Sequence, residues 1–126
     1  MVKLIFMLKR KAGITPQAFR DHYESSHVKL AQKYIGHLLE RYVRNYPVQA
    51  VLNPSNQAKG TAPSPVASEY DVITEMYLKD ALAVQEMSRI FNDPDINPIL
   101  VEDELKFLDR ASTLMLVCDS VDTGTV

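Results

Sequence analysis

The stretch ITPQAFRDHYESSHVKL, residues 14–30, contains the signals that decide the first half of the fold. Thr15 followed by Pro16 predicts a helix start, because a threonine side chain caps free backbone N–H groups and proline suits the first helical position. The positions that follow at helical spacing are Phe19, Tyr23, Ser26, Leu30 and then Lys33 or Tyr34. We therefore expect one helix over 16–34, with Gly36 as its C-cap.

Short β-rich runs and a second helical region surround this helix. Strands are predicted over 2–9, 38–46, 70–78 and 112–118, and helical segments over 79–91 and 98–108. The proline-rich stretch 52–69 predicts a long mobile loop, and 120–126 a frayed tail. The order β-α-β-β-α-β predicts an α+β fold of the ferredoxin-like type, with a four-stranded antiparallel sheet.

The composition indicates a single globular domain over residues 1–126. Hydrophobic residues make up 46% of the chain and charged residues 24%, which excludes disorder as a whole-chain state. The sequence has no apolar run long enough for a membrane span, and its net charge of -2 does not suggest a nucleic-acid partner. The single cysteine allows no intrachain disulfide, so we expect a cytoplasmic protein.

Alternation along the strands predicts two different faces of the sheet. The uniformly apolar face suits the helices and consists of Leu4, Phe6, Leu8, Val72, Met76, Leu78, Leu114, Leu116 and Cys118. The other face is mixed and consists of Lys3, Ile5, Met7, Asp71, Ile73, Glu75, Tyr77, Thr113, Met115 and Val117. Because the mixed face is still too apolar for open water, we expect a second copy of the chain to cover it. Such a homodimer would enclose a small-molecule cavity between its two sheets.

The run from Ile14 to Leu30 resembles the EthD domain family, mainly in the spacing from Thr15-Pro16 through Phe19 to His27. The second half, with Asp103-Glu104 and the run 107–109 before the last strand, resembles it less specifically. The resemblance spans about residues 2–119, except for the atypical 52–69 loop. It implies a dimeric α/β barrel. It also implies similarity to small enzymes of fungal polyketide clusters, described as decarboxylases, dehydratases or cyclases on anthraquinone-type intermediates.

His27 is the first catalytic candidate. It follows Tyr23 by one helical turn and precedes Tyr34 by two, so the three side chains share a face of the predicted helix. A histidine between tyrosines can act as a general acid or base near neutral pH. The resemblance implies that His27 occupies the place of the family's signature polar residue. The competing interpretation is a helix-packing histidine bonded to the backbone or to Asp109.

Three polar residues lie on the expected cavity face of the third strand. Glu75 is a catalytic candidate beside His27 and Tyr23, because a carboxylate facing an apolar cavity has a raised pKa and can exchange a proton. Tyr77 and Asp71 are substrate-binding candidates. For Asp71 the competing interpretation is a salt bridge to Lys3 or Arg41.

Tyr34, Tyr42 and Arg44 complete the substrate-binding candidates. Tyr42 shares one face of the second strand with Arg44, and that face can line the cavity or the dimer seam. An arginine can hold a substrate carboxylate through two parallel hydrogen bonds. The competing interpretation for Arg44 is an exposed side chain on an edge strand.

We expect no metal and no cofactor. His22 and His27 are five residues apart, which places them about 140° apart around an α-helix, so the pair does not form a metal site. Asp103 and Glu104 are interpreted as a solvated face or a capping cluster, and Cys118 as a small buried hydrophobe. The glycines are too scattered for a phosphate-binding loop.

The sequence leaves several functions open. The first is a cofactor-free lyase on an aromatic polyketide intermediate, which decarboxylates an anthraquinone-type carboxylic acid by histidine acid–base chemistry. A cyclase or dehydratase would need nearly the same groups. The alternatives of other classes are a cofactor-free anthrone monooxygenase and a non-catalytic ligand-binding dimer.

Overall fold

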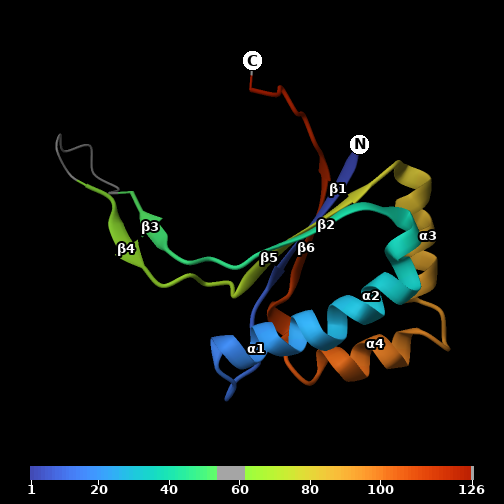
Figure 1. The fold of residues 1–126 in the computed structure, drawn as a ribbon, viewed down its shortest axis with the longest axis horizontal. Helices are drawn as coiled ribbons and strands as arrows, with labels where there is room; N and C mark the ends of the chain where they lie inside the picture. The colour runs from blue at the N-terminus through green and yellow to red at the C-terminus, as the bar shows by residue number, and fades with distance from the viewer. Residues whose placement is uncertain (54–61, 126) are drawn as a thin grey trace.

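The computed structural model describes residues 1–53 and 62–125. In this part of the chain an antiparallel sheet has the strand order β2-β5-β1-β6, and the helices cover one of its faces (Figure 1). The elements of this body are β1 (Val2–Leu8), α1 (Pro16–His22), η1 (Tyr23–His27), α2 (Val28–Ile35), η2 (Gly36–Leu38), β2 (Leu39–Asn45), β5 (Val72–Leu78), α3 (Ala81–Phe91), α4 (Asn97–Glu104), η3 (Arg110–Ser112) and β6 (Leu114–Asp119). Their order and pairing confirm the predicted ferredoxin-like α+β fold.

The first helical region starts as predicted but is not one regular helix. The Thr15 hydroxyl accepts a hydrogen bond from the N–H of Ala18 at 3.0 Å, and Pro16 opens α1. Between α1 and α2, η1 is a π-turn, in which the N–H of Val28 donates to the carbonyl of Tyr23. A π-turn bonds residues five apart, so it changes which side chains share a face. The single helix expected over 16–34 is therefore corrected at Tyr23–His27.

The strand registers decide which side chains face the helices. Residues directly opposite each other in a sheet point to the same face. Leu4, which is buried under the helices, lies opposite Met76 and Val117, whereas Lys3 lies opposite Tyr77 and Cys118. The predicted faces of β1 and β5 are therefore confirmed.

The predicted faces of β6 are wrong. The helix-side residues of this strand are Met115 and Val117, and the residues on the open face are Leu114, Leu116 and Cys118. Thr113, which precedes the strand, lines the cavity on the helix side. Four consecutive apolar residues, 114–117, leave no alternation that could fix the register of the strand in advance. Cys118 is half-buried on the open face and is not a core residue.

The core lies between the helices and the sheet, in two clusters. One cluster contains Leu4, Ala31, Ile35, Met76, Leu78, Met87 and Ile90, and the other contains Leu8, Phe19, Tyr23, Val28, Val72, Phe107 and Leu108. Phe107 is fully buried, and its ring centroid lies 5.4 Å from that of Phe19 and 5.6 Å from that of Tyr23. This aromatic cluster fixes α1 and η1 against the segment after α4.

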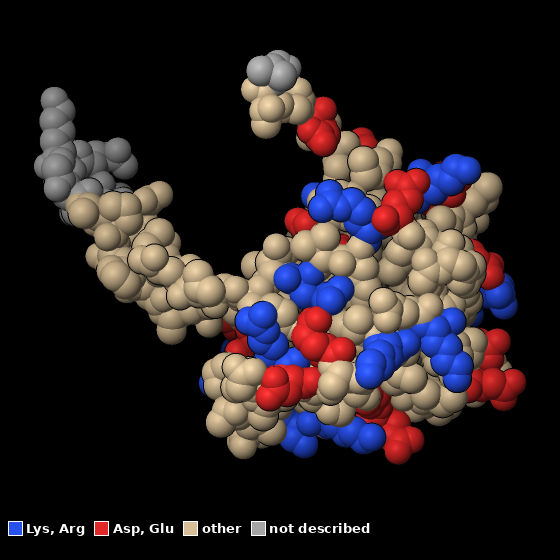
Figure 2. Space-filling model, in the orientation of Figure 1, with Lys and Arg blue, Asp and Glu red and all other residues tan. Residues whose placement is uncertain are grey.

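Between β2 and β5 the chain leaves the body as an arm, in which β3 (Ala50–Leu52) pairs antiparallel with β4 (Ser64–Val66). The arm projects from the sheet away from the helices (Figure 1), and its two strands, β3 and β4, contain no charged residue (Figure 2). The strand β4 replaces part of the loop predicted over 52–69. The tip of that predicted loop, 54–61, and the last residue of the predicted tail, 126, lie outside the described residues.

Candidate functional site

A cavity of about 370 Å³ lies between the helices and the sheet. Its lining is mostly aromatic and aliphatic, with a few polar groups. Side chains from the sheet, from the first helical region and from the second half of the chain line it, among them Phe6, Tyr23, His27, Tyr34, Tyr42, Met76, Phe91, Asn92, Asn97, Leu100, Glu104, Arg110 and Thr113. Concave, mainly apolar sites with a few placed polar groups are typical of small-molecule binding. This cavity is within one protomer and on the helix side of the sheet, unlike the cavity predicted between two sheets.

The π-turn brings two histidines to one carboxylate. His22 Nε2 lies 3.0 Å from Asp103 Oδ1, and His27 Nδ1 lies 2.9 Å from Asp103 Oδ2. The hydroxyl of Ser26 donates to Oδ1 at 2.8 Å. On an α-helix, His22 and His27 would point about 140° apart. The π-turn between them therefore overturns the expectation that they point to different sides.

Asp103 is buried, with 4% of its surface exposed. Burial alone would raise the pKa of its carboxyl, but the hydrogen bonds from Ser26, His27 and His22 outweigh burial and hold the pKa below its usual value. The ionised carboxylate can only accept hydrogen bonds. It follows that His27 carries a hydrogen on Nδ1. Its Nε2 is the ring nitrogen left for chemistry.

The cavity side of His27 holds a second carboxylate. His27 lines the cavity, and Glu104 Oε1 lies 4.0 Å from its Nε2. That separation is beyond hydrogen-bond length. A buried carboxylate therefore orients the ring from one side, and the ring nitrogen on the other side is available to a bound molecule.

The tyrosines beside His27 form a hydrogen-bonded chain. The Tyr23 hydroxyl lies 2.8 Å from Thr74 Oγ1 and 3.2 Å from the Tyr42 hydroxyl. Burial raises the pKa of Tyr23 and of Tyr42. Both tyrosines therefore stay protonated, so each hydroxyl can donate one hydrogen bond and neither serves as a base. Tyr34 lines the same cavity from α2.

Arg44 is not among the cavity-lining residues. Its guanidinium donates two hydrogen bonds to Glu24, from Nε at 3.0 Å and from Nη2 at 2.8 Å. The Arg44 guanidinium lowers the pKa of Glu24, which also accepts a hydrogen bond from Tyr46 at 2.6 Å. The bidentate partner predicted for Arg44, a substrate carboxylate, is thus replaced by a carboxylate of the protein itself.

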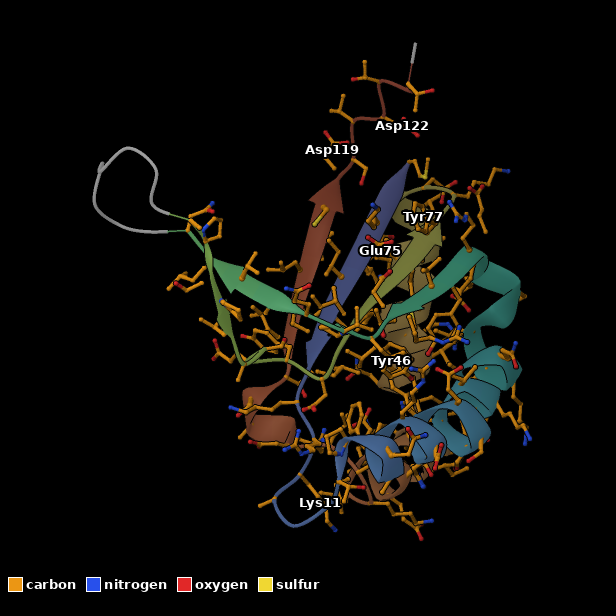
Figure 3. The ribbon with its side chains drawn as sticks, turned by 60° about the vertical axis from the view of Figure 1, so that its left-hand side comes forward. Lys11, Tyr46, Glu75, Tyr77, Asp119 and Asp122 are labelled. Carbon is orange, nitrogen blue, oxygen red and sulfur yellow. The ribbon has the colours of Figure 1, made fainter. Side chains whose placement is uncertain are left out.

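Glu75 and Tyr77 lie on the face of the sheet opposite to the cavity, because they alternate along β5 with the buried Met76 and Leu78. In Figure 3 both lie along the upper part of the sheet, away from α1 at the bottom of the view. Glu75 accepts a hydrogen bond from the Tyr77 hydroxyl at 3.2 Å and lies 3.7 Å from Lys3 Nζ. The structure does not bring these two candidates together with His27 in one protomer.

Asp71 is engaged in an ion pair at the start of β5. Its Oδ1 accepts from Arg10 Nη1 at 2.7 Å and its Oδ2 from the N–H of Arg10 at 2.8 Å. The competing interpretation of Asp71 as a salt-bridge residue was thus right in kind. The partner is Arg10, and not Lys3 or Arg41.

Sequence reasoning missed Asp103, Glu104 and Arg110 as parts of the site. For Asp103 a signal was present, since it lies three residues after Leu100 and four before Phe107, on the helical face of two buried residues. A charged residue at such a position needs a buried partner. For Arg110, which follows α4 and enters the cavity lining from η3, the sequence offers no comparable signal.

The described residues contain no group of three or more histidine, cysteine, aspartate or glutamate side chains arranged to hold a metal. None of the helices in 1–53 and 62–125 has the length and apolar character needed to cross a bilayer.

The fold and the site define a ferredoxin-like α+β protein with a histidine–carboxylate pair at an aromatic cavity. The chain belongs to the EthD domain family, whose sequence profile matches residues 11–111. This match confirms the resemblance inferred from the run that ends at Leu30. A comparison with curated proteins gives no match.

Solved structures share the fold at low sequence identity. An EthD-like protein from Ralstonia eutropha is 13% identical, with a TM-score of 0.61 over 98% of this chain and 95% of that chain. HapK from Hahella chejuensis is 12% identical, with a TM-score of 0.58 over 100% and 98%. A dimeric protein with a ferredoxin-like fold from Bacteroides fragilis is 8% identical, with a TM-score of 0.54 over 94% and 95%. At these identities the likeness shows the fold alone.

Proposed function

We propose that the protein is a cofactor-free lyase that decarboxylates an aromatic, anthraquinone-type carboxylic acid. The observation that carries this proposal is the placement of His27. Its Nδ1 is anchored to the buried carboxylate of Asp103, and the residue lines a cavity with many aromatic side chains. A histidine oriented in this way is suited to general acid–base catalysis.

The cavity supports a planar, mainly apolar substrate. Its volume of about 370 Å³ lies in the range of small-molecule sites. Aromatic rings from β1, η1, α2, β2 and α3 line it, so a flat ring system can pack against them. The polar groups of the lining are few, which is consistent with recognition of a small number of substrate oxygens.

The proposed reaction needs few groups. The substrate carboxylate leaves as carbon dioxide, and the electron pair of the broken C–C bond forms an enolate with the neighbouring carbonyl. Hydrogen bonds from cavity tyrosines such as Tyr34 stabilise the enolate oxygen. Protonated His27 then delivers a proton from Nε2 to carbon, while Asp103 stabilises the imidazolium until the transfer.

The test is a reaction followed by mass spectrometry, with atrochrysone carboxylic acid as substrate and no added cofactor. The wild type should release carbon dioxide well above the uncatalysed rate, and His27→Ala should return the rate to that baseline. His37→Ala is the matched control, because His37 is an exposed histidine outside the cavity lining.

Other products would select other functions. Loss of water would indicate a dehydratase or cyclase, and gain of oxygen an anthrone monooxygenase. Binding without any product would indicate a ligand-binding protein. A wild-type rate equal to baseline, or equal rates in wild type and His27→Ala, would contradict the proposal for this substrate.

For the assembly we propose a homodimer in which a second copy covers the open face of the sheet, as in a dimeric α/β barrel. Leu114 and Leu116 on this face are 44% and 40% exposed, and the arm, whose strands β3 and β4 contain no charged residue, projects on the same side. Exposed apolar surface of this kind is typical of protein interfaces. The Bacteroides fragilis structure with this fold is described as dimeric, which supports the proposal.

Sedimentation velocity tests the assembly. Leu116→Glu should convert a dimer into a monomer, while Leu82→Glu, at an exposed leucine of α3, should leave the dimer intact. A wild-type monomer at all concentrations, or a Leu116→Glu dimer as tight as wild type, would contradict it.

A further inference from the structure

A charged pair lies in the cavity lining next to His27. Glu104 and Arg110 both line the cavity, and Arg110 Nε donates to Glu104 Oε2 at 2.9 Å. The Arg110 side chain is 48% exposed and that of Glu104 is 25% exposed, so a ligand can approach both. Among the described residues that line the cavity, Arg110 is the single lysine or arginine.

Part of the Arg110 guanidinium is open to a ligand. Its Nε is engaged by Glu104, and within 1–53 and 62–125 its two terminal nitrogens donate no hydrogen bond to the protein. Two terminal N–H groups form a fork that fits the two oxygens of a carboxylate. In Arg44, by contrast, both terminal nitrogens donate to the protein: Nη2 to Glu24 and Nη1 to the carbonyl of Tyr42.

The other oxygen of Glu104 faces His27. Oε1 lies 4.0 Å from His27 Nε2, too far for a direct hydrogen bond. A single oxygen atom placed between the two can reach both at ordinary hydrogen-bond length, about 2.8 Å. A hydroxyl suits this place, because its hydrogen satisfies the Glu104 carboxylate and its oxygen accepts from protonated His27.

We propose that Glu104 and Arg110 form a binding subsite for an aromatic carboxylic acid that carries a hydroxyl next to its carboxylate. The carboxylate binds the terminal nitrogens of Arg110, and the hydroxyl binds between Glu104 and His27. The hydrogen bond from the hydroxyl screens the ligand anion from the Glu104 carboxylate. This inference rests on the proposed function, since it specifies the substrate class of the same cavity.

The experiment is a fluorescence titration with three naphthalene probes, which needs no turnover. The probes are an ortho-hydroxynaphthoate, the naphthoate that lacks the hydroxyl, and the naphthol that lacks the carboxylate. The proteins are wild type, Arg110→Gln and Arg110→Lys. The matched control is Arg89→Gln, because Arg89 is also an exposed arginine in an ion pair with a glutamate, Glu86, but lies outside the cavity lining.

The subsite predicts a specific pattern of dissociation constants. Arg110→Gln should weaken the affinity for the hydroxynaphthoate at least about tenfold and change the affinity for the naphthol less than about twofold, because only a ligand carboxylate loses a charged partner. The hydroxynaphthoate affinity of Arg110→Lys should lie between those of wild type and Arg110→Gln, since lysine keeps the charge but lacks the two-pronged guanidinium geometry. In the wild type the hydroxynaphthoate should bind more tightly than the naphthoate.

The opposite pattern would overturn the subsite. Equal affinities of wild type and Arg110→Gln for the hydroxynaphthoate would do so, and so would equal losses for hydroxynaphthoate and naphthol. The two proposals fail separately. If decarboxylation depends on His27 but carboxylate binding does not depend on Arg110, the subsite is wrong and the lyase proposal stands. If ligand binding depends on Arg110 but no hydroxyaryl acid is turned over, the lyase proposal is wrong and the subsite stands.

Discussion

The two faces of the central sheet differ in what their polar residues do. On the helix side, polar side chains such as Asp103 and His27 are enclosed and joined by short hydrogen bonds around a cavity. On the open side, Glu75, Tyr77 and Lys3 contact one another on a half-exposed surface among apolar neighbours. Enclosed polar groups keep a fixed geometry, which catalysis needs, whereas a half-exposed apolar face is suited to contact with another protein.

The largest difference between the regions should appear in stability. Phe107→Ala removes a fully buried ring from the aromatic cluster and should lower the free energy of unfolding by about 3–5 kcal/mol. Leu52→Ala on the arm, where the leucine is 64% exposed, should change it by less than about 0.5 kcal/mol. Urea unfolding followed by circular dichroism measures both, at a protein concentration low enough to disfavour association. Similar losses in the two variants would mean that the arm packs in solution as tightly as the core.

The next effect concerns the orientation of His27. Asp103→Asn removes the negative charge that orients the ring and should lower the decarboxylation rate constant roughly ten- to a hundredfold. The hydroxynaphthoate affinity, read by the same titration, should change little. A rate within about twofold of wild type would show that catalysis by His27 does not depend on the hydrogen bond to the Asp103 carboxylate.

The same carboxylate makes stability depend on pH. The folded pKa of Asp103 lies below its usual value, and unfolding returns it to about 3.9. The ionised carboxylate therefore stabilises the fold above that pH, and its contribution is lost as the pH falls through the folded pKa. Urea unfolding from about pH 6 to about pH 3 should show a smaller loss of stability in Asp103→Asn than in wild type. Parallel curves for the two proteins would contradict this assignment.

A smaller effect is expected at the start of the first helical region. Thr15→Ala removes the cap on the N–H of Ala18 and should cost about 1 kcal/mol of unfolding free energy. Thr15→Ser keeps the hydroxyl and serves as the control in the same urea experiment. Equal losses in the two variants would place the effect elsewhere than in the cap.

The smallest effect should come from the open face. Glu75→Gln keeps the size of the side chain and should change the decarboxylation rate less than about twofold, because Glu75 lies across the sheet from His27. A loss as large as that of Asp103→Asn would restore the prediction that the open face carries the chemistry.

The order of elements and half of the site could be predicted from the sequence. Thr15-Pro16 and the spacing of Phe19 and Tyr23 are local signals. They predict the start and the buried side of the helix without knowledge of the tertiary structure. The sequence predicts Tyr23, His27 and Tyr34 on one face of a regular helix, and all three line the cavity although the π-turn at Tyr23–His27 interrupts that helix. The π-turn could not be predicted, since a shift from four-residue to five-residue hydrogen bonds leaves no mark in apolar spacing.

The remaining errors come from tertiary placement. The faces of β6 depend on a register that its run of apolar residues does not encode. The sequence predicts a ligand carboxylate for Arg44 because nothing in its strand shows that Glu24, twenty residues earlier, reaches it. The position of the cavity itself follows from how the helices pack on the sheet, which the pattern of one chain does not give.

We place the ligand site on the helix side of the sheet. Methionines report on it directly, because Met76 lines the cavity and Met7 lies on the open face, opposite Ile73 and Leu114. The measurement is the NMR spectrum of protein labelled with ¹³C at the methionine methyl groups, titrated with the ortho-hydroxynaphthoate. Binding on the helix side predicts that the Met76 signal shifts until the site is saturated, while the Met7 signal stays in place. A shift of the Met7 signal with no change at Met76 would place the ligand site on the open face and contradict a site on the helix side.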